Sequence, residues 1–258
     1  MKSNKVLLSF DLEEFDLPRE KGKDISLKEG VKVSSEGLEK IINVLDKEGI
    51  RATFFTTGNF AKMRPELVLE LKNKGHEIAC HGVDHFEPAE SDVRESKKIV
   101  EEVTGSKVKG YRQPRMFKIN YDELQRYGYK YDSSVNPAFI PGRYNNFKTP
   151  RKVYKRKGIV ELPVSAATSV RIPLFWLALH LFPKRLYLSL TRSVLEKQQY
   201  FATYFHPWEF ADLKQYEVVP WYIMMNSGDK LALRLSWLIN KLKQDGCEFL
   251  TYSEYLGV

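Results

Sequence analysis

Short runs of β-branched and aromatic residues alternate with amphipathic helical patterns along most of this chain. The first strands are predicted at residues 6–10, 51–56, 76–80 and 108–111, and helical patterns end at Gly49, Gly75, Gly105 and Gly128. Glycine commonly ends a helix because it adopts the left-handed conformation without strain. This alternation is typical of a parallel sheet with crossover helices.

The same pattern continues into the second half of the chain. Further strands are predicted at residues 130–131, 158–163, 200–205 and 247–251, and helices are predicted to begin at Ser35, at Asp92 (with Glu95 as a capping box) and at Asp229. Seven or eight strand-helix units favour an α/β fold, a distorted (β/α) barrel of seven or eight strands. An open doubly wound sheet is the alternative, although no glycine-rich phosphate loop follows the first strand.

The length and composition of the chain limit the number of domains and the class of partner. A chain of 258 residues with 43% hydrophobic content can bury one sizeable core, so we expect a single domain over residues 1–258, with an apolar insertion around residues 170–195. The formal net charge of +8 favours anionic partners such as phospholipid headgroups or lipid-linked sugar phosphates. No run of five or six like charges marks a nucleic-acid-binding arm, so nucleic acid is not an expected partner.

Two features bear on where the protein acts. The N-terminal residues run straight into an apolar strand without the apolar stretch of an export signal, and Cys80 and Cys247 lack metal-site spacing, so a cytoplasmic protein is predicted. The apolar segment 173–182 is too short to span a bilayer. It is predicted to be either a buried helix or loop over the barrel, or an interfacial anchor that places Phe175 and Trp176 in the inner face of the membrane.

Several polar residues stand directly after predicted strands. They are Asp11, Glu13, Glu14, His81, His85, Arg112, Asp132 and His206. In a β/α barrel the carboxyl ends of the strands meet at one rim, where active sites are built. The sequence therefore predicts one pocket that contains all of these side chains.

The histidines and the acids of this set suit a metal site. His81 and His85 are four residues apart, a spacing that on a helical turn brings both imidazoles to one ion. Asp11, Glu13 and Glu14 would repel one another unless a cation lay among them. A divalent ion of the zinc type takes two nitrogens and a carboxylate oxygen and leaves one position open for water. A hydrolase needs a second carboxylate to accept a proton from that water.

In their order along the chain, these motifs resemble those of the polysaccharide deacetylase family, which is homologous to the chitooligosaccharide deacetylases of nodulation. The family's Thr-Phe-Asp-Asp-Gly motif appears as Ser-Phe-Asp-Leu-Glu-Glu at residues 9–14, its His-Ser/Thr-x-x-His motif as His-Gly-Val-Asp-His at 81–85, and its Arg-x-Pro motif as Arg-Gln-Pro at 112–114. A late histidine motif matches His206. The resemblance extends over nearly the whole chain.

The resemblance implies a role for each matching residue. Asp11 would be the general base, and Arg112 would orient it and hold it ionised. His81 and His85 would be metal ligands. His206 would be the general acid, and Asp132 would be the acid that sets the tautomer of that histidine and raises its pKa.

The sequence departs from the family pattern at three positions. Leu12 replaces the aspartate that normally binds the metal, so the third ligand must be Glu13 or Glu14. Glu13 is preferred, because side chains two apart on an extended segment share a face, which places Glu13 beside Asp11. Gly82 replaces a hydroxyl residue and Asp132 lacks the tryptophan that often follows it, so a remodelled substrate groove is expected.

The predicted function is that of a metal-dependent hydrolase that removes an acetyl or formyl group from an amino sugar in a polysaccharide or a lipid-linked glycan precursor. One divalent ion is expected, with zinc first and cobalt, nickel, manganese or iron as alternatives. The rival functions are a metal-independent amidase resembling the allantoinase type, and a non-catalytic glycan-binding or membrane-associated protein. His76 and His180 are expected to be structural.

Overall fold

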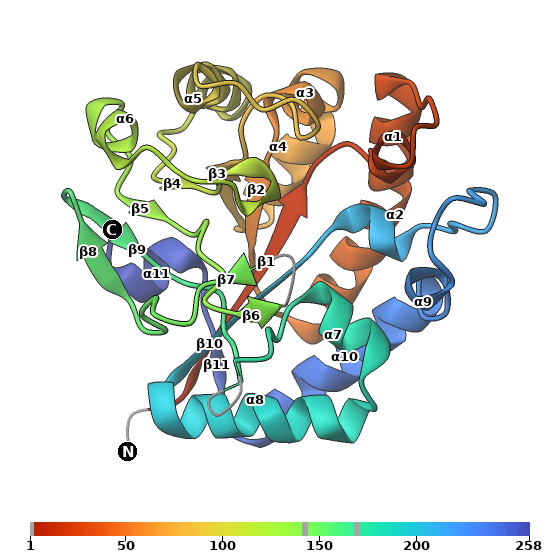
Figure 1. Ribbon diagram of the computed structural model, residues 1–258, viewed down its shortest axis with the longest axis vertical. Coiled ribbons are helices and arrows are strands. Elements are labelled where there is room, and N and C mark those ends of the chain that lie inside the picture. Colours follow the sequence, from red (N-terminus) through yellow and green to blue (C-terminus); the bar gives the residue numbers. More distant parts are fainter. Residues whose placement is uncertain (1–2, 141–143, 168–170) are drawn as a thin grey trace.

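The computed structural model describes residues 3–140, 144–167 and 171–258, and in these residues seven parallel strands form one curved sheet (Figure 1). In spatial order the strands are β10 (Tyr200–Phe205), β1 (Lys5–Leu12), β2 (Thr53–Thr56), β3 (Glu77–Cys80), β4 (Gly110–Tyr111), β5 (Tyr131–Asp132) and β9 (Ile159–Glu161). From β1 onward the order follows the chain, without the reversal of a doubly wound sheet. The predicted single-domain barrel of seven or eight strands is confirmed.

Shorter strands complete the sheet. β8 (Tyr154–Arg156) pairs antiparallel with β9, β11 (Glu248–Phe249) pairs with the start of β1, and β6 (Phe139–Ile140) and β7 (Tyr144–Asn145) form a separate two-stranded sheet. After β9, the Leu162 amide donates to the Asp132 carbonyl (2.9 Å) and the Ser165 amide donates to the Ala202 carbonyl (2.8 Å). The chain after β9 therefore bridges β5 and β10 and partly closes the barrel.

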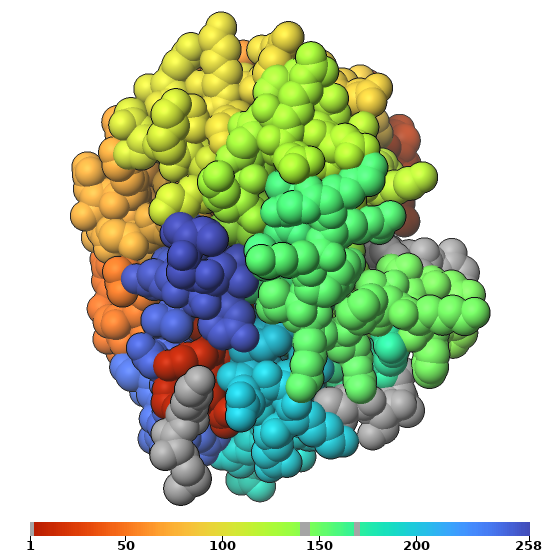
Figure 2. Space-filling model, turned by 90° about the vertical axis from the view of Figure 1, so that its left-hand side faces the viewer, coloured from red at the N-terminus to blue at the C-terminus, as the bar shows by residue number. Residues whose placement is uncertain are grey.

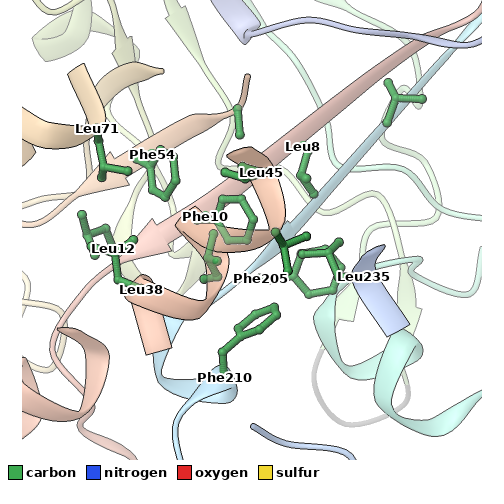
Figure 3. Packing of buried hydrophobic residues seen from close by; sticks show 14 of the residues in the cluster. Leu8, Phe10, Leu12, Leu38, Leu45, Phe54, Leu71, Phe205, Phe210 and Leu235 are labelled. Carbon is green, nitrogen blue, oxygen red and sulfur yellow. The ribbon is translucent and has the colours of Figure 1, made fainter. Parts of the chain in front are cut away.

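Strand β1 shows why this sequence forms a layered structure. Side chains alternate across a strand, and Leu8, Phe10 and Leu12 point outward into the main hydrophobic cluster. Figure 3 shows them among side chains from the helices and the neighbouring strands. The intervening residues, including Leu7 and Asp11, face the interior of the barrel. Strand β1 thus carries core residues on its outer face, and its inner face carries polar residues at the carboxyl end.

Most helices lie around the outside of the sheet, whereas α11 covers one end of the barrel (Figure 1). The helices are α1 (Leu17–Glu20), α2 (Leu27–Glu48), α3 (Gly58–Met63), α4 (Pro65–Asn73), α5 (Asp92–Thr104), α6 (Tyr121–Arg126), α7 (Trp176–Leu181), α8 (Lys184–Gln198), α9 (Trp221–Met224), α10 (Asp229–Gln244) and α11 (Tyr252–Leu256), with short 3-10 turns η1 (Pro114–Met116) and η2 (Pro207–Phe210). α2 and α10 pack on the outward face of β1 through Leu38, Leu45 and Leu235. This outer layer excludes water from one face of the strands that carry the site.

One predicted helix start, at Ser35, and two predicted helix caps, at Asp92 and Asp229, were wrong. α2 begins after Ser26, whose hydroxyl accepts a bond from the Glu29 amide (3.1 Å), rather than at Ser35, because the apolar spacing continues upstream. Asp92 is not the cap of α5, since its carboxylate accepts instead from the Val83 amide (3.2 Å), and no capping box forms there. Gly228, not Asp229, is the cap residue of α10.

The apolar segment around residues 170–195 forms α7 and α8. Leu174, Ala178 and Leu179 are part of the main core, and Phe175 is buried. The prediction of a buried helix over the barrel is confirmed, and half-buried Trp176 packs against the same core. The alternative of an interfacial anchor stays a prediction. Of the described helices, none has the length and apolar character needed to cross a membrane.

The two ends of the described chain meet on one face of the molecule. Figure 2 shows the red N-terminal strand beside the blue C-terminal segment. Lys5 forms an ion pair with Glu248 there, and the Tyr252 hydroxyl, from α11, reaches the interior of the barrel near Ser9. The C-terminal helix therefore helps to fill the barrel beneath the predicted site.

Candidate active site

A pocket of about 800 Å³ opens where β1, β3, β4 and β10 end. Its inner wall contains Asp11, Glu13, His81, His85 and His206. These residues are far apart in the sequence, and each of them is less than a tenth exposed. The predicted convergence at one rim is therefore correct for this group.

Three of these side chains form a compact cluster. Oε2 of Glu13 lies 3.2 Å from Nε2 of His81 and 3.1 Å from Nε2 of His85, and all three residues are buried. Their nearest ligand atoms all lie within 4.8 Å of one another. The two rings stack with their centroids 5.6 Å apart.

The hydrogen bonds behind the two rings determine which nitrogen faces the cluster with a lone pair. Nδ1 of His81 lies 2.9 Å from the Arg112 carbonyl, and Nδ1 of His85 lies 2.7 Å from the Asp16 carboxylate. Because both partners are acceptors, each Nδ1 must carry a proton, and a neutral ring then presents the lone pair of Nε2 to Glu13. Three acceptors that face one another repel unless a cation lies among them, so the donor set fits a divalent metal.

Ionisation of His85 reflects the same crowding of negative charge. Burial lowers the pKa of this imidazole, but the carboxylates of Glu13 and Asp16 outweigh burial and raise it to about 9. Without a metal, a proton would take the place of the cation at this ring. A bound divalent ion would compete with that proton for Nε2.

The choice between Glu13 and Glu14 is clear in the structure. The carboxylate of Glu14 is turned away from the cluster, where it accepts bonds from the Thr57 hydroxyl (2.8 Å), the Asn59 amide (3.2 Å) and the backbone of His85 (3.0 Å). Burial raises the pKa of Glu14. Glu14 thus supports the loop that carries His85, while Glu13 faces the pocket.

That loop is not the helical turn predicted from the four-residue spacing. Residues 81–85 are irregular, and Gly82 has a φ of +69°. A Cβ on Gly82 would lie 2.7 Å from Cγ of Pro114. Glycine suits this position because the backbone is left-handed there and Pro114 packs directly against the loop.

Asp11 and Arg112 form a buried ion pair beside the cluster. Nη1 of Arg112 lies 2.5 Å from Oδ1 of Asp11, and the guanidinium also bonds Ser133 and the Tyr252 hydroxyl (3.2 Å) and covers the ring of Phe55. Burial would raise the pKa of Asp11, but the charge and hydrogen bond of Arg112, together with the charges of His81 and His206, outweigh burial and lower it. Oδ2 of Asp11 remains directed to the cluster, 3.9 Å from Nε2 of His81.

His206 lies beside both Asp11 and Glu13. Its Nε2 is 4.0 Å from Oδ2 of Asp11 and 3.9 Å from Oε1 of Glu13. Burial lowers the pKa of His206, but the neighbouring carboxylates, Glu13 first, raise it overall. The indole of Trp208 donates to Oε1 of Glu13 (3.1 Å), which helps to hold that carboxylate in place.

The prediction that Asp132 orients His206 was wrong. Asp132 follows Tyr131 on β5, and since the Tyr131 ring packs inside the barrel, the next side chain points outward. The carboxylate of Asp132 accepts bonds from Ser134 (2.7 and 3.1 Å) and interacts with Glu161 on the neighbouring strand β9. Burial raises its pKa.

Glu209 occupies the position predicted for Asp132. Its Oε1 is 2.8 Å from Nδ1 of His206, and its Oε2 is 2.8 Å from Nε2 of His180. The sequence signal for this contact was an acid three residues after His206 in His-Pro-Trp-Glu, a spacing that one 3-10 turn brings together. His180, expected to be structural, is buried in this contact, and His76 is buried and accepts a bond from the Ala52 amide (3.2 Å).

Comparisons with known proteins agree with this geometry. The sequence model of the polysaccharide deacetylase family matches residues 2–131, and a model described as a domain of unknown function (DUF3473) matches residues 133–256. The boundary falls within β5, and the two parts pair through β1 with β10 and β5 with β9. Both parts therefore contribute strands to the same sheet.

Curated relatives match the first part of the chain. The peptidoglycan-N-acetylmuramic acid deacetylase PdaA of Bacillus subtilis (strain 168) is 29% identical over 125 residues, which cover 45% of this chain and 47% of PdaA. The peptidoglycan deacetylase of Helicobacter pylori (strain ATCC 700392 / 26695) is 27% identical over 115 residues, which cover 41% of this chain and 39% of that protein. The chain thus spans less than half the length of these two relatives.

Solved structures match nearly the whole chain. A crystal structure from Mycobacterium smegmatis, assigned to the polysaccharide deacetylases, has a TM-score of 0.69 at 20% identity and covers 98% of this chain and 89% of that one. Puue allantoinase has a TM-score of 0.65 at 13% identity, with 97% and 88% covered. At such identities the likeness shows the fold.

Proposed function

Because the chain belongs to the polysaccharide deacetylase family of hydrolases, we propose that it removes an N-acyl group, acetyl or formyl, from an amino sugar with the help of one divalent metal ion. The observation that carries this proposal is the cluster of Glu13, His81 and His85, in which two imidazole lone pairs and a carboxylate oxygen face one another. Zinc is the ion proposed first, since it favours two nitrogens and one oxygen with an open fourth position.

When bound, a divalent ion would act as a Lewis acid toward the acyl carbonyl and the attacking water. The residues of the chain supply the proton transfers. Asp11, kept ionised by Arg112, accepts the proton of the water through Oδ2. His206, whose Nε2 faces the same space, donates a proton to the departing amine nitrogen. Because Nε2 of His206 lies 4.0 Å from Oδ2 of Asp11, the base and the acid can reach the same bound substrate.

The shape of the pocket favours a carbohydrate. Trp176, Tyr204, Trp208 and Tyr222 line it, and aromatic rings stack well on the apolar faces of sugars. A glycan with amino sugars is therefore the proposed substrate class. PdaA and the Helicobacter pylori relative are named for peptidoglycan, which is such a glycan.

Basic side chains line the outer part of the pocket. They are Lys21, Arg115, Lys118 and Arg156. Such a rim attracts substrates that carry a carboxylate or a phosphate, so lipid-linked precursors are included in the proposal. A cytoplasmic location and peripheral contact with the membrane stay predictions.

A screen of the purified protein tests the proposed function. Zinc-loaded protein is incubated with N-acetyl and N-formyl amino sugars, free, polymeric and lipid-linked, and released acetate or formate is measured. Asp11→Asn is expected to bind the metal as the wild type does but to lose turnover by about 10²–10⁴-fold, while Asp24→Asn, an exposed matched control, keeps full turnover. Normal turnover by Asp11→Asn would contradict the mechanism.

The same screen separates the rival functions. Turnover that survives complete removal of metal, with small ureides as the preferred substrates, would favour a metal-independent amidase. Binding of glycans without release of any carboxylate would favour a non-catalytic protein. The intact cluster of Glu13, His81 and His85 argues for a metal-dependent reaction.

A further inference from the structure

A buried chain of hydrogen bonds runs from the pocket into the protein behind His206. Nδ1 of His206 lies 2.8 Å from Oε1 of Glu209, and Oε2 of Glu209 lies 2.8 Å from Nε2 of His180. Glu209 and His180 are fully buried, and His206 is 8% exposed. These hydrogen bonds join two elements, since His180 is on α7, whereas His206 and Glu209 belong to the turn after β10.

The positions of the protons along this chain follow from its acceptors. Oε1 of Glu209 also accepts the backbone N–H of His206 (2.6 Å), so this oxygen is an acceptor and Nδ1 of His206 is the donor. The lone pair of neutral His206, or its second proton, is then at Nε2, which faces Asp11. Bonds from both histidines lower the pKa of Glu209 although burial raises it, which keeps the carboxylate an acceptor.

Aromatic packing fixes the His206 ring in this orientation. The Trp208 ring stacks on it with centroids 5.1 Å apart. Trp176 and Tyr204 pack against it in T-shaped arrangements, with centroid distances of 5.4 Å and 5.5 Å. Trp176 and His180 are four residues apart on α7, so they lie on the same face of the helix. A ring flip that exchanged Nδ1 and Nε2 would have to displace these neighbours and break the bond to Glu209.

We propose that Glu209 and His180 are positioning residues that fix the tautomer and the orientation of His206. Helix α7 supplies His180 and so completes the part of the site that holds the general acid. This inference rests on the proposed function, in which Nε2 of His206 donates a proton to the leaving amine. The family motif assigns this role to Asp132, which points out of the barrel, and assigns none to Glu209 or His180.

Nitrogen-15 NMR of the five histidines tests the inference without any substrate. The wild-type protein, as purified and after zinc is added, is expected to show His206 protonated at Nδ1, with the resonance assigned by its loss in His206→Gln. In Glu209→Gln the tautomer is expected to become mixed. His180→Phe keeps the ring volume beside Trp176, and His180→Gln restores a donor to Glu209.

Kinetics on the best substrate of the screen provide the second measurement. Glu209→Gln is expected to lower kcat by about 10²–10⁴-fold, and His180→Phe by about 10-fold, with KM and metal affinity unchanged; His180→Gln should recover most of that loss. Glu48→Gln is the matched control, because Glu48 is also buried and hydrogen-bonded but contacts α10 far from the pocket. This control is expected to keep wild-type turnover.

The outcomes distinguish the inference from the proposed function. A wild-type His206 protonated only at Nε2 would overturn the inference even if none of the variants folded. Unchanged kcat in both Glu209→Gln and His180→Phe would also overturn it while leaving deacetylase activity intact. The expected tautomer in a protein that releases no carboxylate from any sugar would instead overturn the proposed function.

Discussion

Substitution of Gly37 by alanine is expected to damage both stability and the site, because α2 packs at this glycine directly against the turn that carries His206. A Cβ on Gly37 would lie 1.8 Å from the carbonyl oxygen of Pro207 and 2.7 Å from its carbonyl carbon. Atoms in nonbonded contact rest at about 3.5 Å, so α2 and η2 would have to separate by more than about 1 Å. Both colliding partners are tied to backbone, so no side-chain rotation can relieve the clash.

Two opposing effects set the magnitude. Alanine favours the helix over glycine by about 1 kcal/mol, whereas overpacking costs about 1–3 kcal/mol or more, and a clash with backbone belongs at the upper end. The expected net loss is about 2 kcal/mol of unfolding free energy. Since Pro207 directly follows His206, a displacement of about 1 Å should also reduce turnover by about 100-fold.

Urea denaturation and the carboxylate-release assay measure the two effects. Ser34→Ala is the matched control, since Ser34 is buried in the same helix and its hydroxyl has no hydrogen-bond partner among the described residues. The control is expected to stay within about 0.5 kcal/mol of the wild type. A Gly37→Ala protein that is more stable than the wild type and fully active would refute the packing argument.

Three further predictions concern buried charges. Arg112→Met leaves Asp11 buried without its cation and should lower the unfolding free energy by about 3–5 kcal/mol; adding Asp11→Asn should restore part of the loss in denaturant titrations, and no recovery would contradict the pairing. Burial lowers the pKa of His76 from 6.5 to about 4. The stabilisation that depends on a neutral His76 should therefore be fully present above pH 6.5 and be lost as the pH falls through 4. His76→Gln should reduce the difference in unfolding free energy between pH 7 and pH 4 by about 2 kcal/mol, and identical pH profiles would count against it. Burial and the charge of Asp132 raise the pKa of Glu161, so the unfolding free energy should fall as the pH rises from 4.5 through that raised pKa. Glu161→Gln should make this fall smaller in denaturant titrations at several pH values, and an unchanged or steeper fall would contradict the assignment.

The alternation of side chains along β1 made much of the site predictable from the sequence. Hydrophobic residues at positions 8, 10 and 12 require that Asp11 and Glu13 share the inner face, and the structure places Glu13 beside both histidines. The same rule would have shown that Asp132 points outward, had the inward position of Tyr131 been known. Strand β5 has only two residues, which is too few for the alternation of apolar and polar residues to show which side chain faces the interior.

Other features depended on tertiary contacts that no local pattern encodes. His81 and His85 come together on an irregular loop, whose path is set by the packing of Pro114 against Gly82. His180 meets Glu209 only because α7 folds over the end of β10. Its apolar surroundings in the sequence indicated burial correctly and gave no sign of a polar partner.

The central claim is that Glu13, His81 and His85 hold one divalent metal ion. Anomalous diffraction from zinc-soaked crystals, recorded on both sides of the zinc absorption edge, tests it most directly. The account predicts a strong peak within coordination distance of Nε2 of His81, Nε2 of His85 and a carboxylate oxygen of Glu13, and loss of the peak in His81→Ala. The absence of a peak at these three atoms in fully soaked wild-type crystals would contradict it.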